Sequence, residues 1–135
     1  MKYQSYKDLE IYQIAHKLAI EIHKMSLTKL PKFEMYEEGR QIRKSSKSTA
    51  SNIVEGFGRR RYKNEFILFL TYALASCDET QEHLDTLFET ESLKDKESFD
   101  YFVSNYDVLG KKMTKFIQAV EQGHLAPKAR IKKQG

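Results

Sequence analysis

Several features that define common protein classes are scarce in this sequence of 135 residues. It contains a single cysteine, which excludes an internal disulfide framework and favours a reducing compartment. No apolar run approaches the roughly 18 residues that a membrane-spanning helix needs. The opening MKYQSYKDLE also lacks the apolar segment of a secretory signal. We therefore expect a cytoplasmic protein that does not bind membranes.

Signals for β-strands are also missing. Apolar and polar residues do not alternate over any sustained stretch, and neither Asn-Gly nor Asp-Gly, the usual dipeptides of tight hairpins, occurs. No internal repeat is visible. With 40% hydrophobic and 31% charged residues, the composition suits one globular domain with an apolar core. These features favour an all-α protein.

Four segments carry apolar residues at helical spacing. The last of them is the most regular, because its apolar residues from Phe99 to Val120 are alternately three and four positions apart. The predicted helices span about 7–25, from 34–40 to 56–58, about 62–88 and about 96–122.

Short connections join these segments, and Pro31 interrupts the helical pattern between the first two because proline lacks a backbone N–H. Gly56 and Gly58 are expected at the C-cap of the second helix, where a left-handed conformation is common. The sequence therefore predicts an antiparallel up-and-down four-helix bundle over 1–123, followed by a flexible basic tail over 124–135.

Positive charge is concentrated in two parts of the chain. The segment 40–63 has eight Lys or Arg residues and one acid, Glu55, so its formal charge is +7. The tail has four Lys or Arg residues and no acid. Because the whole chain carries only +4, the remainder carries −7. Segregated basic charge is typical of proteins that bind a polyanion such as RNA or DNA.

The cations of segment 40–63 form the candidate nucleic-acid site. Four of them share one face of the predicted second helix, and four follow at the corner after Gly56-Phe57-Gly58. Contacts from these side chains to phosphates would be non-specific and sensitive to salt. The alternative is an ordinary solvated helix face. The candidate residues are Arg40, Arg43, Lys44, Lys47, Arg59, Arg60, Arg61 and Lys63.

Other chemistry has weak support. A carboxylate-bridged metal site in a bundle needs two Glu-x-x-His pairs, whereas the predicted third helix has Glu79 and His83 at i, i+4. Cys77 lies in the apolar stripe of the third helix and is expected to pack in the core. The glycines before Arg59 lack the Gly-Lys-Ser/Thr ending of a phosphate loop. We therefore predict no metal, no cofactor and no enzymatic activity.

Asn52 and Glu55 have two interpretations. Both lie between the basic and apolar faces of the second helix, and Glu55 is the single acid of the basic segment. We expect them to hydrogen-bond neighbouring helices or to orient an arginine. The alternative is a catalytic carboxylate, for which the sequence offers no base or metal partner.

Several segments in order resemble the four-helix-bundle proteins encoded in intervening sequences of bacterial 23S ribosomal RNA genes. The resemblance extends over nearly the whole chain up to Gly123, and the basic tail lies outside it. Asn52, Glu55 and Gly56 fall on the signature. The matching segments are YKDL at 6–9, QIRKSS at 41–46, SNIVEG at 51–56, FILFLTYALASCDE at 66–79 and HLDTL at 83–87.

The resemblance implies an up-and-down bundle that assembles into a ring of five identical subunits. It also implies a cytoplasmic protein without catalytic activity. The family is similar to the accessory protein of diversity-generating retroelements, a basic bundle that binds nucleic acid and a reverse transcriptase. We therefore expect a non-enzymatic homo-oligomer that binds nucleic acid, with RNA more strongly expected than DNA. A protein such as a reverse transcriptase is expected as a further partner. The alternative is a scaffold that docks an acidic protein.

Overall fold

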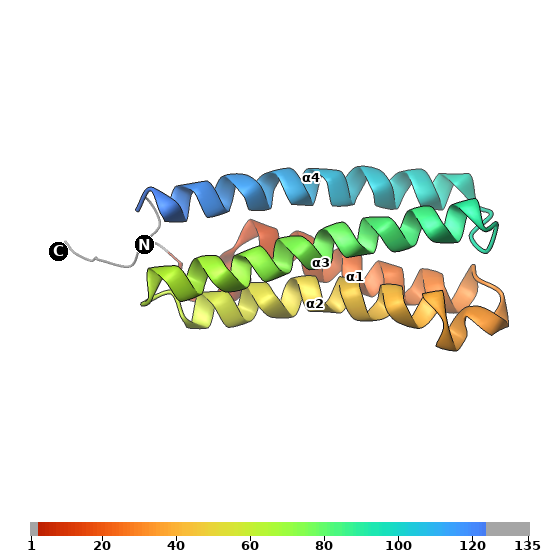
Figure 1. Ribbon diagram of the computed structural model, residues 1–135, viewed down its shortest axis with the longest axis horizontal. Coiled ribbons are helices and arrows are strands. Elements are labelled where there is room, and N and C mark those ends of the chain that lie inside the picture. Colours follow the sequence, from red (N-terminus) through yellow and green to blue (C-terminus); the bar gives the residue numbers. More distant parts are fainter. Residues whose placement is uncertain (1–2, 124–135) are drawn as a thin grey trace.

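The computed structural model describes residues 3–123, which contain helices and no strand, and this confirms the predicted all-α class. Successive helices run in opposite directions in Figure 1, so the bundle is up-and-down. α2 packs against α1 and α3, while α4 packs against α3 and α1. The tail predicted over 124–135 lies outside the described residues. The helices are α1 (Glu10–Thr28), α2 (Glu38–Gly58), α3 (Lys63–Glu89) and α4 (Lys96–Glu121), with short 3-10 segments η1 (Tyr6–Asp8) and η2 (Lys32–Tyr36).

The first helix begins later than the predicted residue 7. The Ser5 side chain accepts a hydrogen bond from the backbone N–H of Lys7, and the Asp8 carboxylate accepts one from the backbone N–H of Ser5 at 3.1 Å. This capping box closes the short turn η1 rather than an α-helix. Leu9 is extended, with φ −78° and ψ 126°, so α1 starts at Glu10.

The glycines near the end of α2 do not form the predicted left-handed cap. Gly56 and Gly58 are both helical, and Arg59 follows the last turn. A Cβ on Gly56 would lie 3.2 Å from the Cβ of Phe69 and 3.3 Å from the carbonyl oxygen of Phe66. Glycine at position 56 therefore lets α2 and α3 approach closely.

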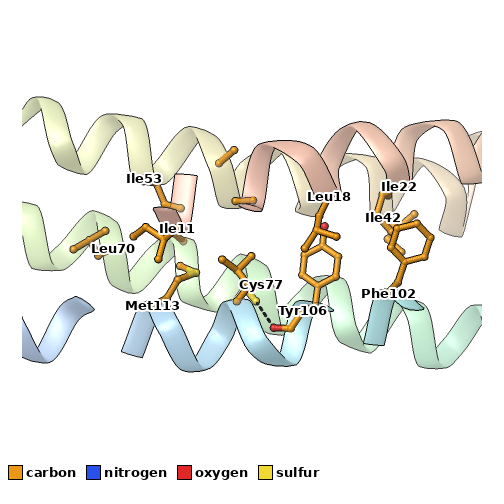
Figure 2. Close-up of a cluster of buried hydrophobic side chains, with 14 of the residues drawn as sticks. Ile11, Leu18, Ile22, Ile42, Ile53, Leu70, Cys77, Phe102, Tyr106 and Met113 are labelled. Atoms are coloured by element: carbon orange, nitrogen blue, oxygen red, sulfur yellow. Dashed lines mark hydrogen bonds between the residues drawn. The ribbon is translucent and has the colours of Figure 1, made fainter. Parts of the chain in front are cut away.

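Apolar side chains from all four helices meet in one core, part of which Figure 2 shows. Ile22 of α1, Ile53 of α2 and Leu70 of α3 are fully buried there. The Cys77 thiol donates to the carbonyl oxygen of Tyr106 at 3.6 Å, and burial raises the pKa of Cys77 to about 12. At neutral pH this thiol stays protonated and packs in the core, as predicted, rather than acting as a nucleophile.

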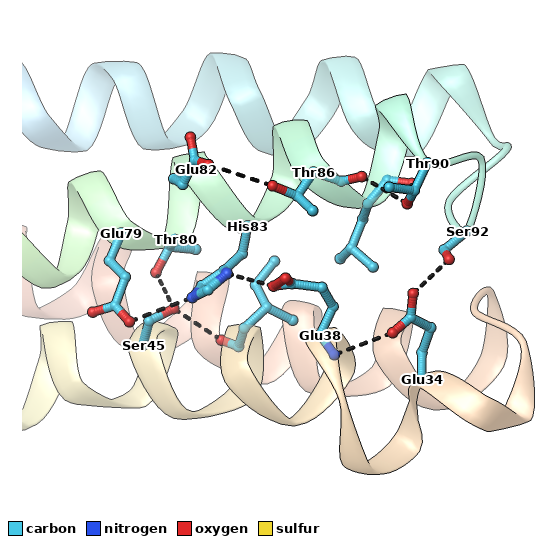
Figure 3. A network of polar contacts seen from close by, with 12 residues as sticks. Glu34, Glu38, Ser45, Glu79, Thr80, Glu82, His83, Thr86, Thr90 and Ser92 are labelled. Atoms are coloured by element: carbon cyan, nitrogen blue, oxygen red, sulfur yellow. Dashed lines mark hydrogen bonds and ion pairs between the residues drawn. The ribbon is translucent and has the colours of Figure 1, made fainter.

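Polar contacts fix how α2 lies against α3 (Figure 3). The hydroxyl groups of Ser45 and Thr80 are 2.8 Å apart in the buried interface. Nearer η2, the His83 ring lies between two carboxylates, with Glu38 2.6 Å from Nδ1 and Glu79 3.3 Å from Nε2. Glu38 and Ser45 thus turn one polar side of α2 toward α3, and the polar side opposite the core faces solvent.

The carboxylate of Asp95, the N-cap residue of α4, is expected to make the stability of the fold depend on pH. The Asp95 carboxylate lies 2.6 Å from the Lys29 ammonium and accepts a hydrogen bond from the Ser98 hydroxyl. These two contacts, Lys29 first and Ser98 second, lower the pKa of Asp95 from 3.8 to about 2. A carboxylate with a lowered pKa stabilises the fold above the unfolded value and loses this effect as pH falls toward 2. We expect Asp95→Asn to reduce the free energy of unfolding at neutral pH.

The difference between Asp95→Asn and the parent should shrink as pH falls from about 4 to about 2. Urea denaturation at several pH values measures it. Asp100→Asn, which breaks an exposed ion pair with Lys96 on the same helix, is the matched control and should cost less at neutral pH. A cost of Asp95→Asn that stays constant on acidification would contradict the role of the carboxylate charge.

Candidate nucleic-acid interface

Helical spacing places three cations on the solvent side of α2. Arg40, Lys44 and Lys47 are four and three positions apart, so they lie on one face. All three are exposed, whereas Ile42 and Ile53 on the opposite side are fully buried. The amphipathic pattern of the sequence therefore produces the predicted exposed basic face. We call Arg40, Lys44 and Lys47 the α2 strip.

The α2 strip is not neutralised by the part of its own chain that the structure describes. Within residues 3–123, none of its three side chains takes part in an ion pair or a side-chain hydrogen bond. α2 also has no acid between Glu38 and Glu55. Three positive charges within about 10 Å of helix axis are thus presented to solvent together.

Arg43 lies between these cations in sequence but differs from them in its contacts. It is half-buried, and its guanidinium donates to the Ser26 hydroxyl at 2.9 Å and to the carbonyl oxygen of Met35. The Ser26 hydroxyl in turn donates to the carbonyl oxygen of His23 at 2.9 Å. Arg43 therefore ties α2 to the end of α1 and to η2, which leaves fewer of its donors for a ligand.

The corner between α2 and α3 holds its first arginine between two acids. Arg59 lies 2.8 Å from both Glu55 and Glu65, and its guanidinium carbon is 4.8 Å from the centre of the Phe69 ring. The orienting role predicted for Glu55 is thus confirmed. Asn52 instead donates to the carbonyl oxygen of Ser48 in its own helix, at 2.9 Å.

The other three cations of the corner also contact their own chain. The guanidinium of Arg60 lies 4.0 Å from the Phe57 ring centre, and that of Arg61 lies 5.9 Å from the Tyr62 ring centre. Lys63 donates to the carbonyl oxygen of Glu121. Arg59 is twelve positions after Lys47, which corresponds to roughly 18 Å of helix. The structure therefore arranges the eight predicted residues as the α2 strip, the inward Arg43 and a separate corner cluster.

Two exposed lysines of α1 were not among the sequence-based predictions. Lys17 and Lys24 are seven residues apart and so on one side of the helix, and Lys24 lines the groove toward α4 rather than the side of α1 next to the α2 strip. Burial first, and then Lys47 and Arg43 of α2, lower the pKa of His23. The sequence signal for these lysines of α1 was the pair of His-Lys dipeptides seven residues apart, which begin at His16 and His23.

No group of three or more His, Cys, Asp or Glu in residues 3–123 is placed to hold a metal ion. The same residues contain no helix with the length and apolar character needed to cross a membrane.

Comparison with known proteins identifies the family. A solved structure with a similar fold is that of a protein of unknown function from the S23 ribosomal protein family of Bacteroides thetaiotaomicron. It superimposes with a TM-score of 0.72 at 21% identity, and the match covers 79% of this chain and 97% of that chain. No curated protein matches the sequence. The family model described as "23S rRNA-intervening sequence protein" matches residues 7–115, and the chain therefore belongs to that family.

Proposed function

We propose that the protein is a non-enzymatic bundle that binds nucleic acid through the phosphates of the strand. The α2 strip makes the main contacts, and Arg60 and Arg61 of the corner extend them. We propose RNA rather than DNA as the ligand because the family takes its name from an intervening sequence of ribosomal RNA. The observation that supports this function best is the set of three exposed cations without an acid partner in residues 3–123.

Binding of this kind has a characteristic dependence on salt. Each phosphate that a cation neutralises releases condensed counterions, so affinity should fall linearly with salt on logarithmic axes. Fluorescence anisotropy of a labelled RNA, titrated with the whole protein between about 50 and 200 mM salt, measures this slope. Absence of binding at the lowest salt would rule out the proposed function. Binding of poly-glutamate as tight as that of RNA would favour an acidic protein as the partner.

We also propose that the protein acts as a homo-oligomer, with the ring of five subunits implied by the family resemblance. A ring would present the α2 strip several times to one strand, and the resulting avidity would strengthen individually weak contacts. On α3, Leu68 and Tyr72 leave 43% and 47% of their surfaces exposed and are candidates for burial between subunits. The solution mass tests the proposal, because a monomeric mass would contradict it.

A further inference from the structure

A hollow of about 320 Å³ lies between α1 and α2, beside the α2 strip. Two of its lining residues are the small and buried Ala19 and Ala50, one from each helix. A larger side chain at either position would occupy this space. Its volume lies at the lower end of the roughly 300–1,000 Å³ found for small-molecule sites. The hollow is therefore large enough to hold one planar ring.

One wall of the hollow is aromatic. Tyr12 and His16 are one helical turn apart on α1, and their rings are stacked, with centres 5.4 Å apart and an angle of 16° between their planes. Tyr12 is half-buried, whereas His16 is exposed. A flat ligand can therefore extend a stack that the protein has already ordered, which lowers the entropy lost on binding.

The charge around the hollow is positive. Lys47 of the α2 strip lines it directly. α1 has no acid between Glu10 and Glu21, and α2 has none between Glu38 and Glu55. A ligand that joins a flat, largely apolar ring to a negative charge complements this arrangement. A nucleotide has both parts, whereas a duplex keeps its bases paired and stacked inside the helix.

We infer that this hollow takes one unpaired base of a single-stranded RNA, stacked beside His16 and Tyr12, while Lys47 contacts the adjoining phosphate. The inference rests on the proposed function and adds to it a preference for single strands over duplexes. Ser51 lies on the α2 side of the hollow and is exposed, so a larger residue there would block the base without entering the core.

The test compares one labelled single-stranded RNA with the same RNA annealed to its complement, at one salt concentration. His16→Ala removes the exposed ring, and Ser51→Leu fills the hollow. Each should weaken binding of the single strand by roughly tenfold, because stacking of one base contributes on that order, and should leave duplex binding unchanged. Ser104→Leu on the exposed side of α4 is the matched control and should change neither. Circular dichroism and thermal unfolding verify that each variant is folded.

Four results would overturn the inference. Unchanged single-strand binding in folded His16→Ala and Ser51→Leu, or equal losses for single strand and duplex, would show that no base enters the hollow, while the proposed function would stand. A change in solution mass without a change in RNA binding would assign the hollow to a contact between copies. Failure of the parent protein to bind either RNA at low salt would remove the proposed function, and the inference with it.

Discussion

Replacement of Arg40, Lys44 and Lys47 together by alanine is expected to lower the affinity for single-stranded RNA by about threefold to a hundredfold. Each exposed cation contributes roughly 0.2–1 kcal/mol in contact with an opposite charge, and the three lie along one face of α2. The slope of log affinity against log salt should become shallower by about 2, because each contact with a single strand contributes about 0.7. Anisotropy titrations at three salt concentrations measure both quantities.

This triple variant should remain folded. Its side chains are exposed, and alanine has a higher helix propensity than the residues it replaces. The control removes the same total charge from α4 and the loop before it, through Lys94→Ala, Lys111→Ala and Lys115→Ala, all at exposed positions. Equal loss of RNA binding in the two triple variants would mean that net charge alone drives association, and the α2 strip would then have no special role.

The helices were predictable because local pattern determines them. The regular apolar spacing from Phe99 to Val120 predicted α4 almost to its ends, since an amphipathic helix buries the same stripe along its length. The start of the first helix and the cap of the second were predicted wrongly, because the residues that indicated them form different local structures. Ser5 and Asp8 form a real capping box, but it closes a 3-10 turn, and Gly56 provides a close approach between helices rather than a cap.

The candidate site was only partly predictable, because the use of a cation depends on residues that are distant in sequence. A helical wheel places Arg43 beside Lys44 and Lys47, and nothing local shows that Ser26, 17 residues earlier, accepts one of its hydrogen bonds. The hollow needs residues of two helices to come together, so no single helical wheel can show it. The exposed α2 strip, in contrast, follows from spacing within one helix.

Arg43→Ala should have the opposite profile to the triple variant, with a large loss of stability and little direct loss of RNA binding. The change removes two hydrogen bonds of a charged group, to Ser26 and to the carbonyl oxygen of Met35, and leaves both acceptors in a partly buried setting. Because hydrogen bonds to charged groups contribute about 1.5–3 kcal/mol, we expect the free energy of unfolding to fall by about 3 kcal/mol. Urea denaturation followed by circular dichroism measures the change.

Lys44→Ala, one residue further along α2, is the matched control and should alter stability by less than about 0.5 kcal/mol. Ser26→Ala provides a second check. In a double-mutant cycle with Arg43→Ala, the two costs should be less than additive, since both changes break the same contact. If Arg43→Ala proved as stable as Lys44→Ala and weakened RNA binding to a similar degree, Arg43 would belong to the binding face, as the helical wheel alone predicts. Stability and RNA affinity measured on the same variants therefore separate the cation that anchors α2 from those that contact the ligand.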